Sequence, residues 1–241
     1  MIKEIVADLH THTHISEHAY SSIYENINEA SQKKLIALGI TDHGPNMKDG
    51  AQLGYFRNLR VINSKVKGVR VLKGVEANII DYNGSIDIPN DTLCKRLEFC
   101  IASFHEDVIS PGTIEQHTNA YLKIAEHPYI DIIGHSGTIG YEFDYEKVLR
   151  QFTYTDKVVE INEASFKVRA SSINNCRNIA VLCKKYKVPI VINTDAHFCE
   201  SIGQAPQSIK MLNEIQFPSE LVINSSKENL ERWLKKKGIQ L

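Results

Sequence analysis

Short apolar runs alternate with longer amphipathic segments along most of the chain. The apolar runs are rich in β-branched side chains, as strands are, whereas the segments between them repeat apolar positions every three or four residues, as helices do. We predict strands over residues 2–9, 39–42, 69–77, 99–104, 130–134, 158–162 and 188–193, with a weaker one at 221–224. We predict helices over residues 24–38, 52–67, 113–125, 145–152, 172–186, 207–215 and 227–237.

This alternation predicts the fold class. Strands that are separated by helices pair in parallel through right-handed crossovers, and continuous apolar strands belong to a sheet that is covered on both faces. No linker or change in composition divides residues 1–241, so we predict one α/β domain. Seven strong strands favour a closed or nearly closed β/α barrel, and an open doubly wound sheet is the alternative.

Composition narrows the possible functions. The 28 basic and 29 acidic residues leave a net charge of −1, which argues against a nucleic-acid or anionic-membrane binder. The first residues carry charge too early for a signal peptide, and no apolar run reaches the length of a membrane span. The five cysteines form no CxxC pair, so we expect reduced thiols in a cytoplasmic protein. A homo-oligomer remains possible.

Histidines are concentrated near the start of the chain. Four of the ten, His10, His12, His14 and His18, follow the first predicted strand. An expression tag would be contiguous, whereas these alternate with other residues, which favours a metal site.

Other histidines and carboxylates follow the later strands. In β/α barrels the carboxyl ends of the strands meet on one face, where active sites lie. The candidates on that face are too many for one tetrahedral ion. We therefore expect more than one metal, with a carboxylate free to bridge. The polar residues at these strand ends are His10, His12, His14, His18, Asp42, His43, Glu76, His105, Glu106, His135, Asp195 and His197.

Six ordered motifs carry a family resemblance. They are Asp8-Leu9-His10-Thr11-His12, Ile40-Thr41-Asp42-His43-Gly44, Gly74-Val75-Glu76, Phe104-His105-Glu106, Ile133-Gly134-His135 and Asn193-Thr194-Asp195-Ala196-His197. On these the chain resembles the PHP (polymerase and histidinol phosphatase) family. The segments at 18–21 and 161–166 make it most similar to the YcdX-type phosphatase branch.

The resemblance implies a distorted (β/α)7 barrel with a trinuclear site at the carboxyl ends of the strands. It implies three divalent ions, with zinc expected first and manganese or iron as alternatives. One ion would be held by His10, His12, Glu76 and Asp195. A second, reached by Glu76 as a bridge, would be held by His105 and His135, and a third by His18, His43 and His197.

The sequence offers no nucleophilic triad and no glycine-rich nucleotide loop, which leaves metal-assisted hydrolysis. Paired divalent ions lower the pKa of a shared water to about 7, so a bridging hydroxide serves as nucleophile and no further catalytic side chain is needed. We expect a phosphatase that acts on small phosphate monoesters. The alternatives are a histidinol-phosphate phosphatase, a phosphodiesterase or exonuclease, and a non-catalytic metal-binding module.

We also predict roles for residues that are not candidate metal ligands. Arg169 and Ser165, in the loop after the sixth strand, would bind the substrate, because a guanidinium grips phosphate through two parallel hydrogen bonds. Asp8 and Asp42 would orient neighbouring imidazoles or act only as turn residues. Four residues remain outside the motif: His14 at the rim, His117 and His127 at the surface, and Cys199, which could approach the metals.

Overall fold

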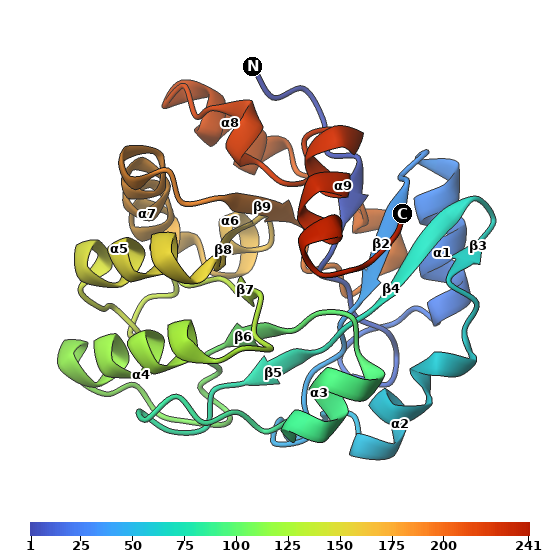
Figure 1. Cartoon of the computed structure of the whole chain (residues 1–241), viewed down its shortest axis with the longest axis horizontal. Helices are drawn as coiled ribbons and strands as arrows, with labels where there is room; N and C mark the ends of the chain where they lie inside the picture. The colour runs from blue at the N-terminus through green and yellow to red at the C-terminus, as the bar shows by residue number, and fades with distance from the viewer.

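The protein is an α/β fold in which helices surround two parallel-stranded sheets (Figure 1). The computed structural model describes the backbone of residues 1–241 and every side chain except that of Cys94. The strands are β1 (Ala7–Asp8), β2 (Ala37–Ile40), β3 (Lys65–Val66), β4 (Val69–Lys73), β5 (Glu76–Asn78), β6 (Ile101–Ser103), β7 (Ile132–Ile133), β8 (Val158–Asn162) and β9 (Ile190–Asn193). The helices are α1 (Ile23–Gln32), α2 (Leu53–Asn58), α3 (Asn90–Arg96), α4 (Ile114–Glu126), α5 (Tyr145–Thr155), α6 (Ser165–Val168), α7 (Ile173–Tyr186), α8 (Pro206–Glu214) and α9 (Lys227–Lys236).

The strand order explains why the barrel is distorted. One sheet has the order β1-β2-β4-β3 and the other β5-β6-β7-β8-β9, and only the β3–β4 pair is antiparallel. Isolated parallel bridges link the two sheets at both seams, from Thr11 to Ala196 and from His43 to Glu76. The parallel strands therefore run in ring order, but the hydrogen-bonded ladder is interrupted twice.

The third predicted strand is two strands in the structure. β4 ends at Lys73, and β5 begins at Glu76 in the other sheet. Gly74 allows this transfer, because a Cβ there would lie 2.6 Å from the ring of Phe99 and 2.9 Å from the Thr41 methyl. Glu76 thus stands at the start of a strand, which corrects the prediction that it ends one.

The predicted strand over 221–224 was wrong in form, because this segment makes a single bridge between Val222 and Ile190. The Asn224 side chain supplies the missing link between β1 and β9. Its Nδ2 donates to the carbonyls of Ala7 at 2.8 Å and Ile192 at 2.6 Å, and its Oδ1 accepts from the Ile192 amide at 3.1 Å. A side-chain amide thus replaces ladder bonds where the first and last strands meet.

Helix lengths were overestimated near the start of the chain. The predicted helix over 24–38 ends at Gln32, because Lys34 takes a left-handed conformation (φ 61°) and the following apolar residues form β2. The predicted helix over 52–67 is divided among α2, a 3-10 turn and β3, and α3 was not foreseen. The later helices match within a few residues, and α4 begins at a Thr113–Gln116 capping box.

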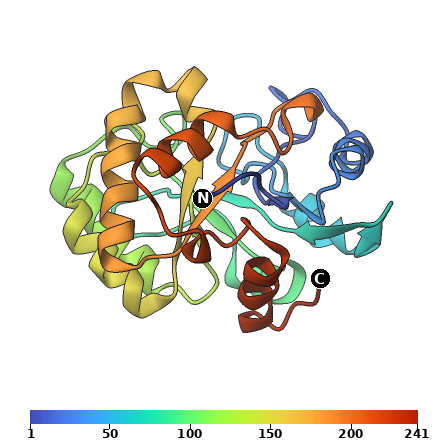
Figure 2. The same ribbon diagram turned by 90° about the horizontal axis from the view of Figure 1, so that it is seen from above.

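Helices enclose the strands from several sides (Figure 2): α5 and α7 lie on one side, α1 lies opposite, and α9 covers an end of the strands. Alternate strand residues such as Ala7, Val158 and Val191 form one apolar cluster with Trp233 and Leu234 of α9. The other strand residues pack in a larger cluster against the surrounding helices. Helix α9 therefore seals the apolar, amino-terminal end of the barrel. Within the described part of the chain, no helix has both the length and the apolar character that a membrane span requires.

Candidate metal centre

The nine candidate ligands converge on one face of the barrel. Eight lie in segments that follow strands, and Glu76 lies just after the end of β4, as the first residue of β5. Three groups have ligand atoms within 4.8 Å of one another: His12 with His43 and His197, His10 with His12 and Glu76, and His43 with Glu76 and His105. The remaining candidates adjoin these groups, as His135, Asp195 and His18 contact Glu76, His12 and His197 respectively. Residues from six strand ends thus share one polar cluster.

Glu76 lies at the middle of this cluster, with its two oxygens facing different histidines. Oε1 lies 2.9 Å from His135 Nε2 and 3.3 Å from His105 Nε2. Oε2 lies 2.8 Å from His43 Nδ1 and 3.2 Å from His10 Nε2. A fully buried carboxylate with imidazoles on both sides is arranged as a bridging ligand would be.

Two pairs of imidazole nitrogens face each other at short distance. His10 Nε2 is 3.1 Å from His12 Nε2, and His18 Nε2 is 2.8 Å from His197 Nε2. The Nδ1 atoms of His10, His18 and His197 are directed at Glu160, Asp49 and the Asp195 carbonyl, which are acceptors. In the neutral tautomer each of these three histidines therefore presents a bare Nε2 lone pair.

Several buried atoms of the cluster have no hydrogen bond of good geometry among the described residues, although some lie as close as the 2.8 Å between His43 Nδ1 and Glu76 Oε2. They are His12 Nδ1, both ring nitrogens of His43, Glu76 Oε2 and Asp195 Oδ1. Buried polar atoms without partners are costly, and facing lone pairs repel unless a cation lies between them. Imidazole and carboxylate donors of this kind fit divalent ions such as zinc. The residues present thus fit the metals that the sequence leads us to expect.

The charges within the cluster are strongly coupled. Burial alone would raise the pKa of Glu76, but His10, His105 and His43 hold it well below its usual range. Burial opposes the charged form of His10, yet Glu160, Glu76 and Asp195 together raise its pKa well above normal. Burial lowers the pKa of His105 to about 4. At neutral pH the metal-free protein therefore has an ionised Glu76, a protonated His10 and a neutral His105.

Glu160, which the sequence analysis missed, connects three parts of the centre. Its Oε1 lies 2.7 Å from His10 Nδ1 and accepts from Asn193 Nδ2 at 2.9 Å, while Oε2 accepts from the His135 amide at 2.8 Å and from Asn162 Nδ2 at 2.9 Å. It lies in β8, within a segment that is otherwise apolar. The signal was present, because an ionisable residue inside a buried strand needs a partner.

Backbone conformation is unusual at two of the candidate ligands. His135 and Asp195 have positive φ values of 20° and 55°, which residues other than glycine rarely adopt. Such strain concentrates at functional sites and persists where the surroundings impose it. At His135 the surroundings include the bond from its amide to Glu160.

Asp8 and Asp42 do not orient imidazoles, which corrects that alternative. Asp8 accepts from the Thr194 hydroxyl at 2.5 Å and from the Gly203 amide at 2.9 Å. Asp42 accepts from the Thr13 amide at 2.6 Å and from the Tyr55 hydroxyl at 2.6 Å. Both carboxylates instead fasten the loops that carry the ligands.

The histidines outside the motifs differ in their exposure to solvent. His14 is exposed at the rim, as expected, and His127 is partly exposed. The prediction that His117 lies at the surface was wrong, because it is buried between the Glu142 carbonyl (2.8 Å from Nδ1) and the Gly112 amide (2.9 Å from Nε2). Cys199 belongs to none of the potential metal-binding groups of the described residues.

Arg169 reaches the centre from the loop after β8. Its Nη2 lies 2.9 Å from Asp195 Oδ2 and 3.3 Å from Asn162 Oδ1, and its Nε is 3.4 Å from Ser165 Oγ. Ser165 is itself buried. The guanidinium is partly exposed, and its Nη1 makes no hydrogen bond or ion pair with the described residues.

Comparison with known proteins shows how the chain is related to them. A family model described as the PHP domain matches residues 8–176. The chain belongs to the PHP domain family. A protein named probable phosphatase from Clostridium botulinum (strain Hall) is 44% identical over 233 residues, covering 97% of this chain and 96% of the relative. Another of that name, from Acetivibrio thermocellus, is 44% identical over 234 residues and covers 97% of both chains.

Solved structures share the fold of this PHP domain at low sequence identity. Histidinol phosphate phosphatase from Lactococcus lactis, solved with zinc, L-histidinol and phosphate, gives a TM-score of 0.59 at 16% identity and covers 97% of this chain and 94% of that chain. A chain of an archaeal ribonuclease P, solved with mature tRNA, gives a TM-score of 0.58 at 16% identity, with coverages of 96% and 90%. At these identities the likeness concerns the fold alone.

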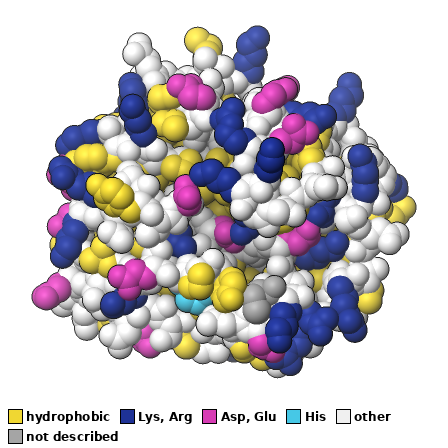
Figure 3. Space-filling view, viewed as in Figure 1, with side chains coloured by type: hydrophobic (Ala, Val, Ile, Leu, Met, Phe, Trp, Pro, Cys, Tyr) yellow, Lys and Arg dark blue, Asp and Glu magenta, His cyan; other side chains and the backbone are white. Residues whose placement is uncertain are grey.

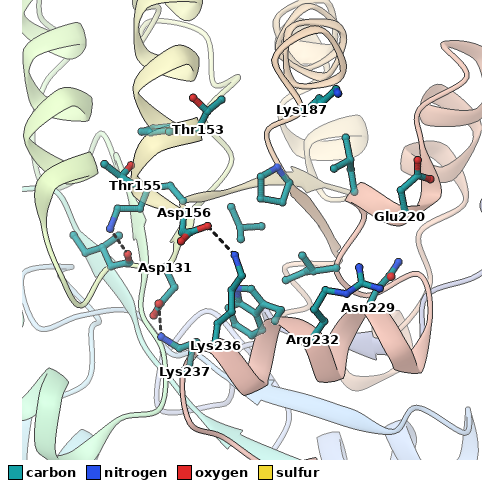
Figure 4. A pocket seen from close by; sticks show the side chains of 18 of the residues that line it. Asp131, Thr153, Thr155, Asp156, Lys187, Glu220, Asn229, Arg232, Lys236 and Lys237 are labelled. Carbon is teal, nitrogen blue, oxygen red and sulfur yellow. Dashed lines mark hydrogen bonds and ion pairs between the residues drawn. The ribbon is translucent and has the colours of Figure 1, made fainter.

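The protein also has a pocket of about 580 Å³ beside α9, near the amino-terminal ends of β8 and β9 (Figure 4). Ion pairs from Asp156 to Lys236 and from Asp131 to Lys237 cross it, and Trp233 forms part of its lining. None of the nine candidate ligands lines this pocket.

Basic and acidic side chains are interspersed on the face of the molecule that Figure 3 shows.

Proposed function

We propose that this PHP domain is a metal-dependent phosphatase that hydrolyses small phosphate monoesters at a centre of three divalent ions, with zinc as the first choice and manganese or iron as alternatives. The observation that carries the proposal is the position of Glu76, whose two oxygens face separate groups of histidines. One bridging carboxylate with imidazoles on both sides suits a multinuclear centre better than a single ion.

The proposed ligand sets follow the motifs. His10, His12, Glu76 and Asp195 would hold one ion, and His105 and His135, with Glu76 as bridge, a second. His18, His43 and His197 would hold the third. The close group of His10, His12 and Glu76 supports the first set directly. The other two close groups join residues from neighbouring sets, which supports adjacent ions in one shared cluster.

The bound ions would supply a water of lowered pKa and would neutralise charge on the phosphoryl group. Arg169 would bind a phosphate oxygen through its free Nη1, because a guanidinium offers several donors in a fixed plane. Ser165 is buried against Arg169 Nε, which favours a role in placing the guanidinium over direct contact with substrate.

Three observations bear on the substrate class. The relatives that align over nearly the whole chain are named probable phosphatases. The near-neutral net charge gives no electrostatic attraction for a long nucleic acid. The fold is shared by a protein named histidinol phosphate phosphatase. These favour a small phosphorylated metabolite over a polymer.

The test is a hydrolysis screen on protein whose metal content is measured in the same sample. The panel should include aliphatic and aromatic phosphate monoesters, histidinol phosphate, a phosphodiester and single-stranded DNA. We expect monoesters to be hydrolysed and the activity to disappear with a chelator and return with zinc or manganese. Preferential hydrolysis of the diester or DNA, or inactivity with three ions bound, would overturn the proposal.

A further inference from the structure

The candidate ligands differ sharply in exposure. His10, His12 and Glu76 are completely buried, whereas the side chains of His18 and His197 are 45% and 29% exposed. The most open histidine is also the one farthest from a strand, in the loop between β1 and α1. The contact that orients the His18 ring therefore decides how tightly His18 can hold an ion.

The contact that holds it comes from another loop. Asp49 Oδ2 bonds His18 Nδ1 across 31 positions of sequence, which leaves His18 Nε2 facing His197 Nε2 at 2.8 Å. Asp49 lies outside every motif that indicates the metal centre.

The fold places Asp49 through a compact loop. The Met47 amide donates to the Gly44 carbonyl, the Gly50 amide to the Met47 carbonyl, and the Ala51 amide to the His43 carbonyl. A Cβ on Gly50 would lie 2.0 Å from the Gly44 oxygen, so a side chain there would open the loop. The loop that begins with the ligand His43 therefore returns to deliver Asp49 to His18.

We propose that Asp49 is a positioning residue for His18, and that it sets how tightly the ion held by His18, His43 and His197 is retained. The inference rests on the proposed trinuclear function and adds its regulation. Carboxylates that accept the second ring N–H of a ligating histidine fix its tautomer and orientation, and their loss typically lowers metal affinity about 10–100-fold.

The ion proposed at His18 differs from the other two in the solvent exposure of the pair that would hold it. His10 has an equivalent partner in Glu160, but that pair is fully buried, and both oxygens of Glu160 also accept hydrogen bonds from other groups. Asp49 and His18 are both partly open to solvent, so their bond competes with water. The ion at His18 should therefore be the exchangeable one, and its occupancy should follow the free metal concentration.

The test loads the whole protein with zinc and follows its release to a chromogenic chelator. For the wild type we expect three zinc ions per chain, with one released faster than the others. Asp49→Asn should accelerate that fast phase about 10-fold or more, and the two slower phases should keep their rates. Asp49→Glu, which retains a carboxylate, should recover part of the wild-type rate.

Glu17→Gln is the matched control, because it removes a negative charge next to His18 from an exposed side chain that makes no hydrogen bond or ion pair with a candidate ligand. Its release profile should equal that of the wild type. Thermal unfolding of the metal-free Asp49→Asn protein should match the metal-free wild type, which separates positioning from a general role in folding.

The outcomes are distinct. An unchanged fast phase in Asp49→Asn, or equal acceleration of all three phases, would overturn the inference while leaving the trinuclear centre intact. A wild type that retains at most two zinc ions would contradict the third site, and with it both proposals. Three retained ions without phosphatase activity would overturn the proposed function alone.

Discussion

Glu160, in the middle of β8, lies 2.7 Å from the Nδ1 atom of His10, 150 positions earlier in the chain. The pair is fully buried, and the remaining oxygen of Glu160 is occupied by the His135 amide and Asn162. One carboxylate thereby fixes the ring of one candidate ligand and the backbone of another.

Replacing Glu160 should loosen the metal centre. Glu160→Gln keeps the shape but removes the charge that favours an N–H at His10 Nδ1, so we expect zinc affinity to fall about 10–100-fold. Competition with a fluorescent zinc chelator measures this. Glu163→Gln is a suitable control, because Glu163 accepts from the amides of Gln207 and Ser208 and contacts no candidate ligand. Unchanged zinc affinity in Glu160→Gln would contradict the assignment.

Loss of the bridging carboxylate should be worse than loss of a terminal histidine. We expect Glu76→Ala to lower metal content and phosphatase activity more than His18→Ala, because Glu76 faces two groups of histidines and His18 only one. Both variants should fold, since the apolar end of the barrel is unaffected. Elemental analysis and initial rates decide the order, and equal losses would remove the bridging role.

Arg169 should contribute to substrate binding and not to metal retention. Arg169→Ala should keep the fold and the ions but lose about 10–100-fold in kcat/KM, the size expected for a lost charged hydrogen bond of about 1.5–3 kcal/mol. Arg169→Lys should recover only part, because an ammonium cannot bind through two parallel N–H groups. Since Arg169 also contacts Asp195, elemental analysis must accompany the kinetics. A normal kcat/KM in the alanine variant would exclude this role.

The Asn224 amide should matter for stability without touching the centre. Asn224→Ala leaves the carbonyls of Ala7 and Ile192 and the amide of Ile192 without their side-chain partner in a buried seam. Each such group costs about 1–3 kcal/mol, so with three of them we expect the free energy of unfolding to fall by about 3 kcal/mol or more. Urea unfolding of metal-free protein gives the value. A loss below about 0.5 kcal/mol, the range of ordinary surface changes, would mean that Asn224 does not join the strands.

Metal removal should destabilise the whole domain. Without cations, His12 Nδ1, Glu76 Oε2 and Asp195 Oδ1 stay buried without a hydrogen-bond partner. We expect a lower Tm in excess chelator than in zinc, because a ligand that binds only the folded state stabilises it. Differential scanning calorimetry with and without chelator tests this, and identical Tm values would contradict it.

Sequence patterns predicted the later half of the fold well and the earlier half less well. β8 has the predicted bounds, 158–162, because turn-forming or polar residues flank a clear apolar run. The helix predicted over 24–38 was too long. Residues 35–38 continue the apolar spacing of α1, but they belong to the connection and to β2. Local periodicity cannot show where a chain reverses direction when both elements are apolar.

The candidate ligands could be proposed from their motifs, whereas their partners could not. Asp49 sits in an ordinary polar loop, and Glu160 sits in an apolar strand, so neither has a local signature that joins it to a distant histidine. Such partners are defined by contacts between separate elements, which only a three-dimensional arrangement supplies. Asp8 and Asp42 show the reverse case: both stand inside the motifs, yet they fasten loops.

The junction of β1 with Asn224, and the packing of α9 beneath it, have a consequence for protein synthesis. Ala7 leaves the ribosome long before Asn224 and Trp233, so β1 lacks its seam partner and its apolar cover until those residues have been made. The first and last strands can therefore be joined only 217 positions after Ala7 has been synthesised. During that interval β1 stays without the buried contacts that it has in the folded protein.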